Sequence, residues 1–239
     1  MRTTLLLGAA LIGMAVASSA QAAAPLLQMQ LTSGAATSGV LTEGAGGVVT
    51  FVGSLGVFTL NVTNGFGATA GLGKTIDLAS FNATAAAGGT LTMMLTETNL
   101  TGVPITPTQF LSNISGQLGI NSATLTSLSY TTYISAANTA FATTTLVGAT
   151  QNFSAPSGGA AGTSFATTPA GGVTGSAVTG ALFSETLVVT LTTGGSSRTS
   201  LDATMGPKAV PEPSSILPLA FGIGAITLIA RRRKRDSEI

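Results

Sequence analysis

The stretch ETLVVTLTT at residues 185–193 alternates apolar and hydroxyl-bearing side chains with a period of two. Leu187, Val189 and Leu191 fall on one face of such a segment, and Thr186, Val188 and Thr190 fall on the other. Successive side chains of a β-strand point to opposite sides of a sheet, so this pattern is typical of a strand with one buried face. The β-branched residues Thr and Val also favour extended backbone. The stretch therefore predicts a half-buried strand.

The same alternation recurs along the region between residues 25 and 205. Four further segments show it, each bounded by Gly, Asn, Pro or Ser: 26–31, 57–63, 89–98 and 127–135. Between the two chain ends the sequence allows one short helix, for example at residues 106–119. Residues 155–180 are the most Gly-rich part, and both a flexible linker and strands joined by wide turns fit this composition.

Roughly eight to ten short strands with half-buried faces predict an all-β fold, because such strands usually pair as two packed sheets. We expect a single β-sandwich-like domain over residues 23–205. A solenoid of stacked repeats is the alternative, but no fixed sequence period supports it.

The composition excludes several kinds of chemistry. The chain has no His and no Cys, so it has no Ser-His-Asp triad, no Cys nucleophile and no thiolate or imidazole metal ligand. Between residues 25 and 210, the three basic residues are Lys74, Arg198 and Lys208. The five acidic ones are Glu43, Asp77, Glu97, Glu185 and Asp202, so three minus five gives a net charge of −2. A nucleic-acid binder needs clustered basic residues, and this region has no such cluster.

The acidic residues predict no active site. A glycosidase needs two carboxylates roughly 5–10 Å apart. Glu97 and Glu185 lie at the ends of separate predicted strands, and solvated strand ends are the expected outcome. Asp77 and Asp202 are isolated in sequence, so we expect no calcium site. We predict no catalytic, cofactor-binding or metal-binding residue, and therefore a protein that is not an enzyme.

Residues 1–22 have the features of a secretory signal peptide. Arg2 supplies the positive end, Leu5–Ala17 form the apolar run, and Ala20 and Ala22 fit the small-residue rule for signal peptidase. We expect export through the Sec translocon and cleavage after Ala22. A permanent N-terminal anchor is the alternative, but the run is short for a bilayer.

The C-terminal residues 206–239 combine several elements in a definite order. A short tether at 206–210 leads to a Pro-Glu-Pro motif, an apolar run at 214–230 and a basic tail. The motif consists of Val210, Pro211, Glu212 and Pro213, and the tail of Arg231, Arg232, Arg233, Lys234 and Arg235.

The apolar run predicts a transmembrane helix. Its core, Ile216–Ala230, would span roughly 22 Å as a helix, and snorkelling Arg side chains close the gap to the ~30 Å hydrocarbon core. The basic tail keeps its own end cytoplasmic. A buried core helix with a solvated basic tail is the alternative, which the terminal position and the basic block disfavour.

Together the motif, the apolar run and the basic tail resemble the PEP-CTERM sorting signal of Gram-negative bacteria. The resemblance implies recognition by an exosortase, an integral-membrane transpeptidase-like enzyme that cuts near the motif and releases or transfers the body to the outer surface. The two prolines suit such a substrate, because they cannot donate main-chain hydrogen bonds and they keep the chain extended.

The resemblance also implies a bacterium that makes extracellular polysaccharide and biofilm. We therefore expect a precursor anchored in the inner membrane, then a protein at the cell surface or outside the cell. Its expected role is structural or adhesive, in association with exopolysaccharide. The alternatives are a carbohydrate-binding module acting on that matrix and, least favoured, a secreted hydrolase that uses two carboxylates.

Overall fold

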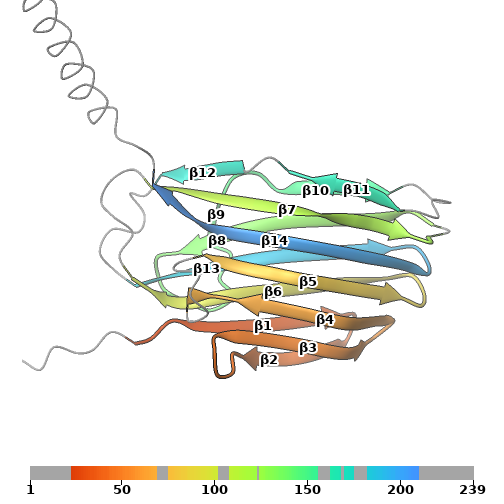
Figure 1. Cartoon of the computed structure of the whole chain (residues 1–239), viewed down its shortest axis with the longest axis horizontal. Helices are drawn as coiled ribbons and strands as arrows, with labels where there is room; N and C mark the ends of the chain where they lie inside the picture. The colour runs from red at the N-terminus through yellow and green to blue at the C-terminus, as the bar shows by residue number, and fades with distance from the viewer. Residues whose placement is uncertain are drawn as a thin grey trace, which may run out of the picture.

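The computed structural model describes residues 23–68, 75–101, 108–122, 124–155, 162–167, 170–174 and 182–209. Within these ranges the chain forms fourteen strands in two seven-stranded antiparallel sheets (Figure 1). The described ranges contain no helix long and apolar enough to cross a membrane. The predicted signal peptide at 1–22 and the predicted transmembrane helix at 214–230 lie outside them.

The first sheet, sheet A, holds the strand that the opening stretch predicts. Its strand order is β10 (Gln151–Ala155), β8 (Thr126–Ser135), β13 (Phe183–Thr193), β6 (Gly89–Leu100), β1 (Leu26–Ser33) and β2 (Ala36–Thr42), with β9 (Thr145–Leu146) also paired to β8.

The second sheet, sheet B, faces sheet A. Its order is β11 (Thr163–Ala166), β7 (Thr108–Ile120), β14 (Ser197–Ala209), β5 (Ile76–Ala85), β4 (Phe58–Phe66) and β3 (Val48–Leu55), with β12 (Ala170–Thr174) also paired to β7.

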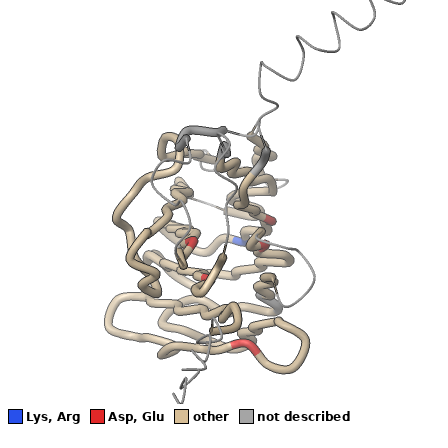
Figure 2. Tube along the Cα trace, turned by 90° about the vertical axis from the view of Figure 1, so that its left-hand side faces the viewer, with Lys and Arg blue, Asp and Glu red and all other residues tan. Residues whose placement is uncertain are grey.

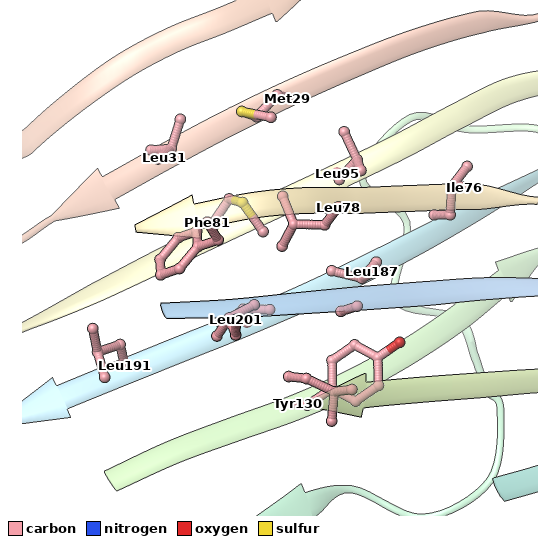
Figure 3. Close-up of a cluster of buried hydrophobic side chains, with 14 of the residues drawn as sticks. Met29, Leu31, Ile76, Leu78, Phe81, Leu95, Tyr130, Leu187, Leu191 and Leu201 are labelled. Carbon is pink, nitrogen blue, oxygen red and sulfur yellow. The ribbon is translucent and has the colours of Figure 1, made fainter. Parts of the chain in front are cut away.

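One hydrophobic core lies between the sheets (Figure 3). The residues predicted for the inner face of 185–193 are at most 1% exposed: Leu187, Val189 and Leu191. They meet buried side chains of sheet B such as Leu78, Phe81 and Leu201. The predicted β-sandwich is therefore confirmed, and stacked solenoid repeats are not what the chain forms.

The last two strands occupy the middle of the fold. Strand β13 lies between β6 and β8 in sheet A, and β14 lies between β5 and β7 in sheet B. Neither sheet is continuous until this C-terminal hairpin is in place. The fold therefore depends on pairing between segments that are distant in sequence, and that pairing reaches the last described residue.

The short helix predicted at 106–119 is wrong, because the described part of this segment belongs to strand β7. Phe110, Ile114 and Leu118 are buried and four residues apart, a spacing that suits one face of a helix and one face of a strand equally well. Pairing with β14 from Arg198 to Ala209 decides for the strand. The spacing alone carries no information about that partner.

The Gly-rich region contains two of the short strands, β11 and β12. The ring of Phe165 packs on Phe153 of β10 with centroids 4.6 Å apart. Because β10 belongs to sheet A and β11 to sheet B, this contact joins the two sheets at one edge. The described part of the region is therefore ordered as strands and not as a linker.

Candidate functional site

The body and the sorting motif are continuous in the chain. Residues 206–209, predicted as part of a tether, instead belong to β14, where they pair with β7. The last pair of this ladder joins Ala209 to Thr108. Val210 follows immediately. The motif residues 210–213, the basic tail 231–235 and the signal-peptidase residues Ala20 and Ala22 lie outside the described residues.

A pair of buried acidic residues lies inside the sandwich. Glu97 on β6 and Glu185 on β13 stand directly opposite each other in the sheet A register. Both are 0% exposed, so the expectation of solvated strand ends is wrong for both. Inward-facing residues alternate along each strand. Glu97 lies two residues after the inward-facing Leu95 on β6, and Glu185 lies two residues before the inward-facing Leu187 on β13. That alternation is the sequence signal that places them inward.

Sheet B contributes a backbone donor to this pair. The amide of Ala68, just after β4, donates a hydrogen bond of 2.7 Å to Glu97 Oε1. A Cβ on Gly67 would lie 2.6 Å from the same oxygen, so the close approach requires glycine there. Glu97 Oε2 is buried without a hydrogen-bond partner within the described structure.

Burial governs the protonation of Glu97. Loss of solvent raises the pKa of its carboxyl to about 7, the Ala68 hydrogen bond opposes this, and the nearby charge of Glu43 adds to it. Burial likewise raises the pKa of the Tyr130 hydroxyl, with Glu185 and then Asp77 contributing. Because both glutamates lack exposed surface, the pair offers no face on which a polysaccharide chain can lie.

The two aspartates are also brought together, on the outer face of sheet B. Asp77 pairs with Thr204 of β14, and Asp202 on the same strand accepts a 2.7 Å hydrogen bond from the Ser80 amide. Partial burial, followed by the charge of Asp202, raises the pKa of Asp77. No group of three or more acidic, His or Cys residues that could hold a metal ion is present in the described ranges.

A polar hollow surrounds the one described basic side chain. Charged residues are sparse along the chain (Figure 2), and Arg198 is exposed near the start of β14. It lines two adjoining hollows of about 140 and 30 Å³. Their other lining residues are Asn61, Asn82, Ala83, Thr84, Ala85, Ile120, Asn121, Ser196, Ser197, Thr199 and Ser200. Sequence reasoning missed this site because its residues come from four separate strands and two turns.

Residues 209–234 match the family model of the PEP-CTERM protein-sorting motif. The chain thus belongs to the class of exported proteins that carry a C-terminal sorting signal. It is a PEP-CTERM sorting domain-containing protein, and the motif indicates a membrane-anchored precursor that an exosortase processes. No curated protein and no solved structure matches the chain. The match covers only the C-terminal end, so it establishes the sorting route and not the activity of the body.

Proposed function

We propose that the body is a non-enzymatic surface protein with a structural or adhesive role in an exopolysaccharide matrix. The signal peptide at 1–22 directs export, and the helix at 214–230 holds the precursor in the inner membrane. Exosortase processing near Pro211-Glu212-Pro213 then delivers the sandwich to the cell surface or the extracellular space. The observation that carries this proposal is the sorting motif that directly follows β14.

The outer face of sheet A supports a role in packing against uncharged polymer. Across β6 and β13, Thr90 and Thr192 hydroxyls lie 3.1 Å apart, and the Thr92 and Thr190 hydroxyls lie 3.4 Å apart. Such hydroxyl pairs offer donors and acceptors without charge. A surface of this kind makes hydrogen bonds with sugar hydroxyls without the cost of desolvating ions.

The test compares three strains of the producing organism: wild type, a strain without exosortase, and one with Pro211, Glu212 and Pro213 all replaced by Gly. The wild-type body should be recovered in the matrix fraction, and the other two strains should retain it in the inner membrane. Replacing Ser214 and Ser215 by Ala is the matched control, because it keeps the motif and the apolar run. Loss of matrix cohesion should accompany retention of the protein. A body that washes free of the matrix, or whose loss leaves cohesion unchanged, would overturn the proposal.

A carbohydrate-binding module is the second candidate function. The observation that favours it is the hollow around Arg198, where amide and hydroxyl side chains surround an exposed guanidinium. Amides, hydroxyls and arginine are the groups that bind sugar hydroxyls and sugar carboxylates. The two functions differ in specificity, since a module selects among polysaccharides and a packing protein does not.

A further inference from the structure

The hollow around Arg198 is built by neighbouring strands of sheet B. In the ladder, Arg198 stands between Thr84 of β5 and Ile120 of β7. Two residues further along β14, Ser200 pairs with Asn82. These register positions place one cation, one amide and two hydroxyl side chains on adjacent strands. The apolar edge of Ile120 completes the lining.

Arg198 is not neutralised by the protein around it. No acidic residue lines either hollow, and Arg198 makes no ion pair within the described structure. A guanidinium presents a planar fork of donors that matches a carboxylate in a bidentate arrangement. An exposed, unpaired arginine among neutral polar groups therefore fits a ligand that carries its own negative charge.

The ligand that fits the remaining lining is a sugar. Asn82 and Ser200 supply donors and acceptors for ring hydroxyls, and Ile120 offers apolar surface to the C–H face of a ring. Asn82 and Ser200 line the smaller hollow of about 30 Å³, which shares Thr84, Ile120 and Arg198 with the larger one of about 140 Å³. Even together the two are smaller than the roughly 300 Å³ at which drug-sized pockets begin. They therefore suit one ring of a polymer whose other rings continue over the open face of sheet B.

The hollow lies at the end of β14 that is far from the sorting motif. Arg198 is the second residue of β14, and Ala209 is the last. Eleven residues of extended chain at about 3.3 Å each separate them by roughly 36 Å. The hollow and the attachment point thus lie at opposite ends of the sandwich, as Figure 1 shows for the two ends of β14. A body held at Ala209 therefore presents the hollow away from its attachment.

We propose that this hollow is a binding site for a carboxylate-bearing sugar of an acidic polysaccharide, with Arg198 pairing with the carboxylate and Asn82 and Ser200 holding ring hydroxyls. The inference rests on the proposed association with exopolysaccharide and specifies its polymer class. With such a site, the body is sorted through the motif that follows one end of β14 and binds the matrix through the hollow at the other end.

The test uses the processed protein purified from the extracellular fraction and two polymers, sodium polygalacturonate and neutral dextran. Wild-type protein should bind polygalacturonate more tightly than dextran, with affinity that falls as salt rises. Arg198→Gln should weaken polygalacturonate binding about tenfold to a hundredfold, as expected for one lost charge-assisted contact. Arg198→Lys should fall in between, because lysine keeps the charge and loses the fork. Dextran binding should be the same in all three proteins.

Leu125→Ala is the control, since Leu125 is exposed at the same end of the sandwich, where its carbonyl accepts a hydrogen bond from the Gly194 amide, and lines neither hollow. Circular dichroism and thermal unfolding of each variant check the fold. Wild-type protein that does not prefer polygalacturonate, or an Arg198→Gln protein that still binds it like wild type, overturns this site. Neither result touches the proposed function, which stands or falls on matrix retention in the exosortase strains.

Discussion

Glu97 and Glu185 face each other across β6 and β13, fully buried in the interior of the sandwich. Two acids in such a position cannot both be ionised without cost, because burial removes the water that stabilises each charge. The Ala68 amide is the donor that reaches Glu97 from the opposite sheet. Burial of Glu97 therefore links the stability of the sandwich to pH.

The stability of the body should fall as pH rises from 5 to 8. The pKa of Glu97 is about 7 in the folded protein against an ordinary value of 4.5. A raised pKa means that the folded state holds the proton more tightly than the unfolded chain does. The added stability is full below about 4.5 and is lost as pH rises through 7. The free energy of unfolding should fall by at most about 3 kcal/mol over this range. Urea unfolding at a series of pH values measures it.

Glu97→Gln is the variant that isolates this effect. The neutral amide still accepts the Ala68 hydrogen bond, so the slope between pH 5 and 8 should become shallower and the protein more stable than wild type at pH 8. If Glu97→Gln keeps the full slope, another group is responsible for the pH dependence.

Gly67→Ala should destabilise the body by about 1–3 kcal/mol, the usual cost of forcing atoms into a filled space. The new Cβ would sit 2.6 Å from Glu97 Oε1 and 2.8 Å from its Cδ. Gly44→Ala is the control, since nothing lies within 4 Å of the Cβ built there. Combining Gly67→Ala with Glu97→Ala should cost less than the sum of the two single changes. Strict additivity in this double-mutant cycle would contradict the contact.

The sequence was sufficient for the class of fold and for the inner faces of its longest strands. In β13 the alternation identifies Leu187, Val189 and Leu191 as core residues, and in β4 it identifies Phe58 and Leu60. Period-two patterning works here because one face of each strand is buried and the other is not. The same pattern does not predict strand order, because each strand pairs with partners far along the chain.

The way the candidate site residues come together could not be predicted for that reason. Glu97 and Glu185 belong to strands separated by β7 to β12, and only the sheet A register places them opposite each other. Arg198 is an isolated cation in the sequence. It becomes part of a site only when β14 inserts between β5 and β7 and brings it beside Thr84 and Ile120. Local patterning contains neither relationship.

Tyr130→Phe should lower the free energy of unfolding by about 1 kcal/mol, the usual net contribution of one hydrogen bond. The Tyr130 hydroxyl on β8 donates to the carbonyl oxygen of Thr204 on β14 at 2.8 Å, so the bond joins the two sheets through the core. Tyr133→Phe is the matched control on the opposite face of β8 and should leave stability unchanged. Equal urea midpoints for the two variants would show that the bond between the sheets contributes nothing.

Processing of the exported protein should leave β14 whole. Gly206 to Ala209 pair with Leu111 to Thr108 of β7 in the middle of sheet B, next to the buried side chain of Met205. A cut before Ala209 would break those pairs and open the core. The mature C-terminus should therefore fall at residue 209 or later. The predicted signal-peptide cleavage after Ala22 places the mature N-terminus at Ala23.

Intact mass and terminal peptide mapping of the extracellular protein measure both ends, in cells with and without exosortase. Chains that end after Ala209 and after Met205 provide the comparison. The longer chain should keep wild-type urea stability and the shorter one should lose about 1 kcal/mol for each ladder hydrogen bond removed. A mature protein that ends before residue 209 would show that the end of β14 does not set the limit of processing. One that keeps residues 231–235 when exosortase is present would show that the sorting signal is not cut.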